Sequence, residues 1–335
     1  MLVFLVRRLA GGVVQLLAIT LITWAVFFLL SGLTGANPAE RIAGKTATPE
    51  RIAEIKKQLG TDRPYWEQYV DYDWRLLHGD FGYSYEQARP VRDIVFPAAA
   101  TTASLVLGAA VVWLLIGAVI GVLGALRPGG WVDRGLMALA LLGISVPVFW
   151  LAPMVSYVFA YQPTQGSVLG IPLPGPSRWF PIDGYVNLRD DPAQWAYHLV
   201  LPWLTFAVGF AAIYARYVRA LTLEQRGLDY VRTATAKGGT PGYVLRRHIA
   251  PNVAPVIVTL LGLDVGIALG GALFVEQVFG LPGLGYVGLH SIQQLDYPLV
   301  AGVITFAAIV AVTANTVVDV IQGALDPRVR VGAAQ

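Results

Sequence analysis

Six long, sparsely charged apolar windows restrict the fold of this 335-residue chain more than any other feature. They lie at about residues 9–31, 100–126, 135–161, 199–222, 254–278 and 300–322. Each is long enough to cross a bilayer, because a transmembrane helix needs about 20 apolar residues. With 56% hydrophobic and 13% charged residues, the composition excludes an ordinary soluble domain. The sequence therefore predicts an all-α, polytopic membrane protein with six transmembrane helices.

Two of the windows have unusual features. Pro147 and Pro153 lie in the third window, and proline is tolerated in membrane helices where neighbouring groups satisfy the freed carbonyls. The first window follows Arg7-Arg8 and is longer than the apolar core of a secretory signal peptide, which has about 7–15 residues. No clear cleavage site follows it. We therefore interpret it as an uncleaved first span, the alternative being a cleaved signal.

Lysine and arginine are divided unequally between the two sides of the predicted bundle. Thirteen lie on the side of both termini and of the 127–134 and 223–253 loops, whereas the short loops of the other side hold two, Arg178 and Arg189. The 33–97 segment carries nine more, but translocated segments beyond about 60 residues largely escape the positive-inside rule. This rule predicts a multi-pass protein of the cell (inner or plasma) membrane with both termini cytoplasmic. The same cations suit contacts with anionic membrane lipid, and no nucleic-acid partner is needed to explain them.

Two polar segments are predicted on the outer side. Residues 33–97 form an insert in which Thr48-Pro49-Glu50 is a helix cap, with apolar residues following at helical spacing up to Leu59. The aromatic stretch 65–77 suits either an amphipathic helix at the headgroup level or a platform that docks a soluble partner. Residues 162–198 are crowded with proline and glycine, which predicts no regular structure. That loop is either a lid over a pathway or a connector.

A polar, basic segment at 229–252 separates the fourth and fifth windows. Asp229 is predicted to cap a short helix over 230–237, because its carboxylate accepts the free N–H groups of a first turn. Gly238-Gly239 supplies a left-handed end to that helix, and Thr240-Pro241 begins a second one. The pattern predicts two short helices joined by a glycine elbow just outside the bilayer, in a form that fits the groove of another protein.

The segment 229–238, DYVRTATAKG, closely resembles the cytoplasmic coupling loop, or EAA loop, of ABC importer permeases. The triplet of that loop falls on Arg232, Thr233 and Ala234 and its glycine on Gly238. The same stretch of the peptide/nickel/opine branch is similar to DYVRTARAKG followed by a histidine and an asparagine, here His248 and Asn252. Further landmarks of this branch are spread over the chain: GDFGYS at 79–84, FGLPGLG at 279–285, DYP at 296–298 and LDPRVR at 325–330.

The resemblance implies the type I permease fold of an ABC importer with an extracytoplasmic helical insert after the first helix. The domains would be 1–32 (N-terminus and first helix), 33–97 (insert), 98–322 (permease domain) and 323–335 (cytoplasmic tail). It implies a second homologous permease, two ATPase subunits and an extracytoplasmic substrate-binding protein as partners. Substrates would be di- or oligopeptides, with nickel chelates or oligosaccharides as alternatives. The ATPase-coupling residues would be Asp229, Arg232, Thr233, Ala234, Lys237, Gly238, His248 and Asn252.

The sequence lacks the motifs of catalysis and nucleotide binding. It has no G-x-x-x-x-G-K-[ST] phosphate loop, no H-E-x-x-H, no G-x-S-x-G and no cysteine. We therefore predict a transport subunit and not an enzyme, with no cofactor or metal of its own. ATP and Mg would be bound by the partner ATPases.

Ionisable groups inside apolar spans are expensive, and Asp264, Glu276 and Asp319 are therefore the candidate pathway residues. Glu276 is close to the outer end of its window and Asp319 to the inner end, so an interfacial or helix–helix role is open for each. An ion-coupled secondary transporter is the alternative class. It would couple through buried charges and usually has internal repeats, and no repeat is evident here.

Overall fold

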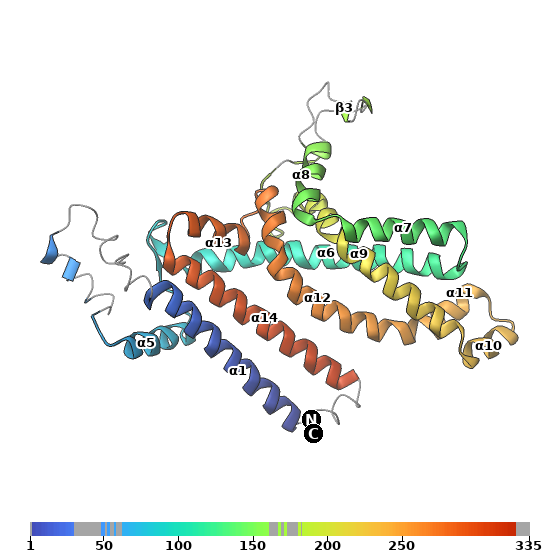
Figure 1. Ribbon diagram of the computed structural model, residues 1–335, viewed down its shortest axis with the longest axis horizontal. Coiled ribbons are helices and arrows are strands. Elements are labelled where there is room, and N and C mark those ends of the chain that lie inside the picture. Colours follow the sequence, from blue (N-terminus) through green and yellow to red (C-terminus); the bar gives the residue numbers. More distant parts are fainter. Residues whose placement is uncertain are drawn as a thin grey trace. The chain divides into compact units, whose positions relative to one another are not determined.

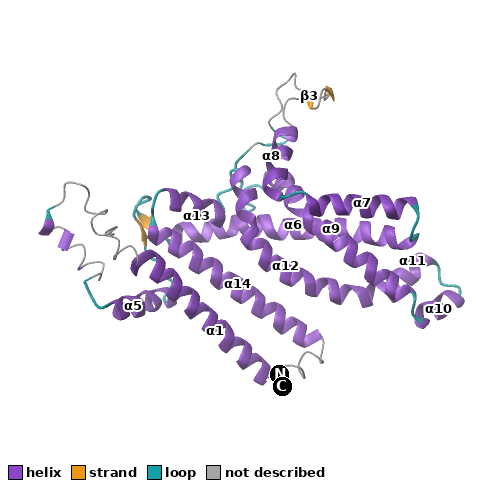
Figure 2. Ribbon diagram, viewed as in Figure 1, coloured by secondary structure: helices purple, strands orange, loops and turns teal. Residues whose placement is uncertain are grey.

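The computed structural model describes residues 2–29, 48–50, 52–53, 57, 62–160, 167–168, 171–172, 180–181 and 183–325, and helices dominate it (Figures 1 and 2). The helices are α1 (Leu2–Trp24), α5 (Tyr65–Leu77), α6 (Arg92–Leu126), α7 (Trp131–Ser145), α8 (Val148–Phe159), α9 (Pro192–Arg226), α10 (Asp229–Ala236), α11 (Pro241–Val244), α12 (Ala250–Val278), α13 (Leu284–Gln293) and α14 (Tyr297–Leu325), with π-helical turns η1 (Ala25–Leu29) and η2 (Leu245–Ile249). Two short antiparallel strand pairs complete the described elements: β1 (Tyr83–Ser84) with β2 (Arg89–Pro90), and β3 (Ser167–Val168) with β4 (Ile171–Pro172).

Five helical segments are long and apolar enough to cross a membrane: Val6–Leu29, Arg92–Leu126, Pro192–Arg226, Pro241–Val278 and Tyr297–Val317. The predicted span 135–161 is different, because α7 and α8 meet there at 105°. Proline at 147 holds Val146 in an extended conformation (ψ 116°), which ends α7. The described residues therefore contain five candidate spans, or six if the bent pair counts as one.

The chain forms two compact units. Among the described residues, the first contains those up to Ala100 together with 286–317, and the second contains Thr101–Gly285 together with 318–325. In the second unit, small residues allow α6 and α9 to approach closely. A Cβ on Gly117 would lie 3.0 Å from the Ala211 carbonyl oxygen, and one on Gly121 would lie 2.6 Å from that of Ala215. Such close approach of backbones is how helices pack inside membranes.

In the first unit, the predicted aromatic helix at 65–77 is present as α5 and has two faces. Tyr72 is buried and its hydroxyl lies 3.0 Å from Thr305 Oγ1 on α14. Burial raises the pKa of Tyr72 to about 12. Trp66 and Trp74 are exposed on the other face. Of the helix predicted up to Leu59, only 49–50, 52–53 and 57 lie within the described residues, and these are helical.

A buried carboxylate closes the contact between residues 72–86 and the start of α14 (296–306), which we call the α14 joint. Asp296 accepts a hydrogen bond of 2.5 Å from the Ser84 hydroxyl and longer ones from the amides of Tyr85, Glu86 and Leu299. Ser84 and Asp296 are 0% and 2% exposed. Two stretches noted separately in the sequence, 79–84 and 296–298, are therefore one structural element.

The segment 162–198 departs from its prediction at two places. The described residues include the β3–β4 hairpin, where no regular structure was expected. In addition, α9 begins at Pro192, before the predicted start at 199, because the Asp191 carboxylate accepts the amides of Ala193 and Gln194 at 2.9 and 3.0 Å. Proline at the first helical position needs no hydrogen-bond donor, so the earlier start is a favourable one.

Candidate coupling site

Residues 229–252, which we call the elbow, connect α9 to α12 through α10, α11 and η2 at one end of the second unit (Figure 1). Helix α10 ends in two backbone hydrogen bonds. The Gly239 amide donates to the Ala234 carbonyl (3.1 Å), and the Gly238 amide donates to the Thr235 carbonyl (2.9 Å). Gly238 has φ +86°, as this type of helix end requires. The Thr240 side chain accepts the Tyr243 amide, and Pro241 begins α11. The predicted two helices and glycine elbow are present.

The two adjacent glycines at the end of α10 are required for different reasons. A Cβ on Gly238 would meet no atom within 4 Å, so glycine is favoured there only by the positive φ. A Cβ on Gly239 would lie 2.8 Å from the Ala234 carbonyl oxygen and 3.0 Å from Val244 Cγ2. Within this chain, the glycine that permits a close approach of the backbone is therefore Gly239.

The inner face of the elbow is apolar. Val231, Val244 and Ile249 are buried in one cluster with residues of α9 and α12. Ala234 is partly buried and packs against the same cluster. Of the two small residues in this helix, Ala234 and Ala236, only Ala236 is exposed. Burial of three aliphatic side chains holds the short helices on the ends of the long ones, at about 1.5–3 kcal/mol each.

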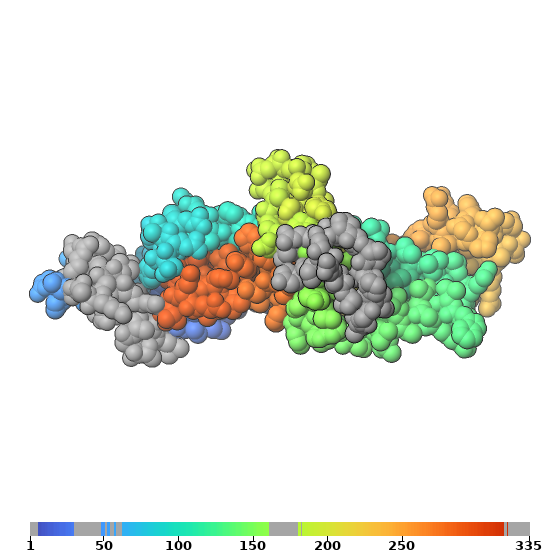
Figure 3. Space-filling model, turned by 90° about the horizontal axis from the view of Figure 1, so that it is seen from above, coloured from blue at the N-terminus to red at the C-terminus, as the bar shows by residue number. Residues whose placement is uncertain are grey.

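The outer face of the elbow carries exposed polar side chains. Figure 3 shows this segment in light orange at the surface of the second unit. Arg232, Thr233, Lys237 and Gly238 are all exposed. The Arg232 side chain is 73% exposed and lies 3.5 Å from the Asp229 carboxylate, which is 96% exposed. An ion pair this open contributes little to folding. These residue types are therefore not explained by the stability of the chain.

Asp229 is not the helix cap that the sequence predicted. Helix α10 begins at Asp229 itself, its cap position is Leu228, and no side chain caps it. A carboxylate in the first turn still interacts favourably with the helix dipole. The Asp229 backbone carbonyl also accepts a hydrogen bond of 2.9 Å from the Thr233 hydroxyl.

The last two predicted coupling residues, His248 and Asn252, connect the elbow to the start of α12. The side-chain amide of Asn252 donates to the His248 backbone carbonyl at 2.7 Å and to the Tyr230 hydroxyl at 3.2 Å. Tyr230 in turn donates to Gln225 at 2.6 Å. These bonds link α10 to the end of α9 and the start of α12. The intervening π-helical turn η2 carries Arg246, Arg247 and His248, and such turns are frequent at functional sites.

A buried ion pair beside the elbow was missed by the sequence analysis. Asp133 at the start of α7 accepts two hydrogen bonds from Arg219 of α9, at 2.6 and 2.7 Å, and one from the Gly129 amide at 2.7 Å. Asp133 is 3% exposed. Arg226 also donates to the backbone carbonyls of Ala125 and Leu126 at the end of α6. Side chains of α9 thus bind the ends of α6 and α7 where the chain turns into the elbow.

The three pathway candidates lie in different surroundings. Asp264 is partly buried in α12 and accepts a hydrogen bond of 2.9 Å from the buried Tyr214. Glu276 is 0% exposed and accepts the Thr102 hydroxyl at 2.6 Å; the same hydroxyl accepts the Leu284 amide at 2.8 Å. Glu276 therefore holds α12, α6 and the 279–285 turn together. Asp319 lies in α14, and its side chain is outside the described residues.

The comparisons with known proteins cover nearly the whole chain. Residues 117–331 match the family described as binding-protein-dependent transport system inner membrane component, and residues 1–106 match the N-terminal part of such membrane components. The probable peptide ABC transporter permease protein y4tP of Sinorhizobium fredii is 34% identical over 98% of this chain and 99% of its own length. The dipeptide transport system permease protein DppB of Escherichia coli K12 is also 34% identical, over 98% and 99%.

A putative peptide transport system permease protein of Brucella abortus is 35% identical over 97% of this chain and 98% of its own. Among solved structures, an inward facing conformation of the MetNI methionine ABC transporter matches 68% of this chain and 96% of that one, with 18% identity and a TM-score of 0.46. That structural similarity is too low to establish a shared fold by itself. The sequence matches are sufficient: this multi-pass membrane protein belongs to the family of inner-membrane components of binding-protein-dependent transport systems.

Proposed function

We propose that this chain is one of two permease subunits of an ATP-driven importer of di- or oligopeptides. It forms half of the translocation pathway and couples to a separate ATPase through the 223–253 loop. The peptide assignment is supported by the names of its relatives, which are peptide and dipeptide permeases. No relative reported above is named for nickel chelates, oligosaccharides or ion-coupled transport.

The single observation that carries the coupling role is the two-sided construction of the elbow. Its apolar side is buried against α9 and α12, whereas Arg232, Thr233 and Lys237 are exposed on the other side. A short helix pair anchored this way moves as a rigid body with the ends of two long helices. An ATPase that grips the exposed side would therefore transmit its closure directly into the membrane part of the chain.

The topology of this proposal follows from the distribution of cations. Both termini, the elbow and the 323–335 tail are cytoplasmic, and the 33–97 insert is outside, where a substrate-binding protein delivers the peptide. ATP and Mg are bound by the two ATPase subunits. Asp264, Glu276 and Asp319 remain the pathway candidates. Within this chain, the buried Glu276 also fixes α12 against α6 through its hydrogen bond with Thr102.

The decisive test reverses charge on the exposed side of the elbow. The double variant Arg232→Glu and Lys237→Glu leaves the buried anchor intact, so it should fold and insert normally. It should reduce recovery of the ATPase with the affinity-purified permease by roughly tenfold, because charge complementarity at interfaces is costly to reverse. Peptide uptake should fall in parallel.

A control reverses a single exposed cation away from the elbow, in Arg189→Glu. This variant should retain the ATPase and transport normally. Unchanged ATPase recovery in the elbow variant would refute the coupling role. Mass spectrometry of the same purification identifies the second permease and the substrate-binding protein, and the ligand of the latter tests the peptide assignment separately.

A further inference from the structure

The inner face of α5 is aromatic and holds this helix against the first span. The ring centroids of Tyr65 and Tyr69 lie 6.5 and 5.8 Å from that of Trp24. The ring centroid of Tyr72 lies 5.7 Å from that of Phe28. Both partner residues belong to the candidate span Val6–Leu29. Helix α5 therefore lies beside a membrane span, as Figure 1 also shows.

Two hydroxyl contacts show how far α5 reaches along the spans. The Tyr69 hydroxyl lies 3.3 Å from Thr20 Oγ1 on α1. The Tyr72 hydroxyl lies 3.0 Å from Thr305 Oγ1 on α14. Thr20 is nine residues from the nearer end of its candidate span, and Thr305 is eight residues from the nearer end of its own. At about 1.5 Å per helical residue, both contacts are roughly 12–14 Å inside the spans.

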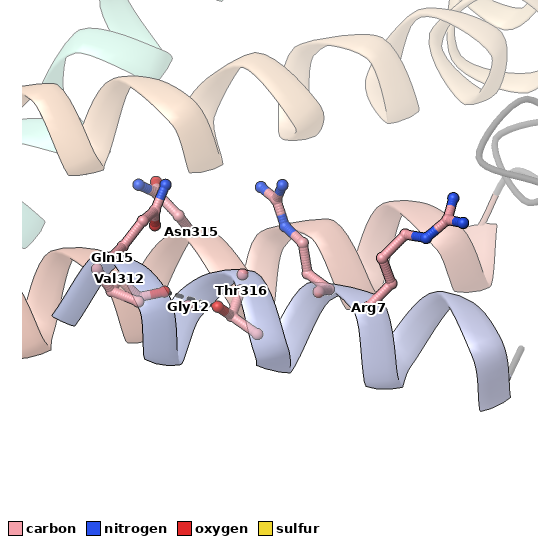
Figure 4. A pocket seen from close by; sticks show the side chains of 8 residues that line it. Arg7, Gly12, Gln15, Val312, Asn315 and Thr316 are labelled. Atoms are coloured by element: carbon pink, nitrogen blue, oxygen red, sulfur yellow. Dashed lines mark hydrogen bonds between the residues drawn. The ribbon is translucent and has the colours of Figure 1, made fainter. Parts of the chain in front are cut away.

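The two depths agree because α1 and α14 are aligned with each other. A Cβ on Gly12 would lie 3.2 Å from Val312 Cγ1, and Figure 4 shows these residues where the two helices run side by side. Near the opposite end of α1, the ring centroids of Phe27 and Tyr297 are 6.2 Å apart. Contacts at both ends place the ends of the two spans at the same level. Helix α5 is therefore held within the thickness of the membrane at that end.

The rest of the α5 surface is divided between a polar and an apolar face. The polar face carries Glu67, Asp71 and Arg75, and Arg75 Nε lies 3.4 Å from the Asp71 carboxylate. The apolar face repeats at i, i+4, i+8 and i+11 and is well exposed: Trp66 68%, Val70 58%, Trp74 62% and Leu77 80%. The partly buried Asp73 lies at the border between the apolar and inner faces. An exposed apolar patch of this kind marks an interaction surface.

A cavity of about 570 Å³ shows which way the polar face is directed. Its lining includes Asp71 and Arg75 of α5, Phe28 near the end of the first span, and residues 80–83. The polar face is therefore directed toward the end of the span and the water beyond it. The apolar face is on the opposite flank of α5, toward the middle of the span. Exposed aliphatic side chains of α1 lie in that direction: Val13, Val14 and Leu17.

We propose that α5 lies in one leaflet of the bilayer, with Trp66, Val70, Trp74 and Leu77 among the lipid acyl chains. Interfacial amphipathic helices bury their apolar face about 5–10 Å below the headgroups, and tryptophan is favoured at that level. A soluble partner would have to enter the membrane to reach a face directed toward its middle. In the topology proposed above, this is the outer leaflet. Apart from that assignment, the inference does not depend on the proposed function.

The test uses the absence of cysteine from this chain, because a spin label can then be attached at one chosen position. Val70→Cys and Leu77→Cys place the label on the apolar face. Glu67→Cys and Arg75→Cys are the matched controls on the polar face. The purified full-length chain is reconstituted in vesicles of phosphatidylethanolamine and phosphatidylglycerol. Electron paramagnetic resonance then measures how often each label collides with molecular oxygen and with the water-soluble chromium oxalate anion.

The ratio of oxygen to chromium oxalate collisions should be at least about tenfold higher at positions 70 and 77 than at 67 and 75, because moving an ion out of water costs several kcal/mol. Leu77→Cys keeps the test valid if Val70→Cys inserts poorly, since Leu77 is the more exposed side chain. Equal ratios on the two faces would overturn the proposal. Chromium oxalate access at 70 and 77 that is lost when the substrate-binding protein is added would also overturn it, because a soluble protein would then cover this face. The measurement uses neither peptide nor ATP, so its failure is distinct from a failure of the proposed function.

Discussion

The elbow and the α14 joint are held in opposite ways. In the elbow, polar side chains are turned outward: Arg232 and Asp229 are 73% and 96% exposed and lie 3.5 Å apart. In the joint, Asp296 is 2% exposed and accepts the Ser84 hydroxyl at 2.5 Å. Exposed ion pairs contribute little to folding, whereas a buried carboxylate with all its donors in place is expensive to disturb. The polar groups of the joint therefore stabilise this chain, whereas those of the elbow are exposed and open to the partner that we propose.

The largest effect is expected at the joint, for Asp296→Ala. The substitution leaves the Ser84 hydroxyl and the amides of Tyr85 and Leu299 without their acceptor in a buried place. We expect a loss of roughly 3 kcal/mol in the free energy of unfolding, because each orphaned buried donor costs about 1–3 kcal/mol. Unfolding of the solubilised protein by a graded denaturing detergent measures it.

Asp296→Asn provides the control, because it keeps the shape and one acceptor oxygen. Its free energy of unfolding should fall by about half as much as that of Asp296→Ala. Hydrogen exchange at residues 229–252 should stay as in the unmodified chain for both variants. If hydrogen exchange in the elbow changed as much as at residues 81–86, the joint and the elbow would not be independent of each other, and the distinction between them would be wrong.

A smaller effect is expected for Gly239→Ala in the elbow. The new Cβ would lie 2.8 Å from the Ala234 carbonyl oxygen, so the backbone bond that ends α10 must lengthen. We expect local opening of the elbow to become easier by about 2 kcal/mol, measured by hydrogen exchange at the amide of residue 239.

Gly238→Ala is the matched comparison, because its Cβ would meet nothing within 4 Å and only the φ of +86° is unfavourable. It should make local opening of the elbow easier by about 1 kcal/mol. If Gly238→Ala has the larger effect, backbone conformation and not close packing determines the shape of the elbow.

The elbow could be predicted because its shape depends on residues that are adjacent in the sequence. The contacts of the α14 joint could not be predicted, because their residues lie far apart along the chain. Gly238 and Pro241 act on their immediate neighbours, so their positions fix where α10 ends and α11 begins. Ser84 and Asp296 are 212 residues apart, and no periodicity reports such a contact. The resemblance marked the stretches that contain them without joining them. Asp133 was missed for the same reason, since its partner Arg219 is 86 residues away.

The predicted helix boundaries were wrong where the boundary depends on the conformation of a single residue. The cap predicted at Asp229 is displaced by one residue, because Asp and Glu are favourable both at the cap and in the first turn. Pro147 and Pro153 lie in one apolar window, and composition alone does not tell which of them bends it. The 105° angle between α7 and α8 at Pro147 follows from the extended backbone of Val146, which only the structure reveals.

The smallest effect is expected for Tyr72→Phe in the α14 joint, where a neutral hydrogen bond is lost and the buried carboxylate of Asp296 is kept. Tyr72 makes a neutral hydrogen bond to Thr305 at 3.0 Å, so Tyr72→Phe should cost only about 1 kcal/mol at neutral pH, in the same unfolding assay. The pKa of Tyr72 is raised by burial from 10.0 to about 12, so the folded state keeps a proton that the unfolded state loses. This stability is complete below pH 10 and is lost as the pH rises toward 12. Tyr72→Phe should therefore flatten the alkaline loss of stability, and an unchanged alkaline slope would mean that Tyr72 is not buried in the folded protein.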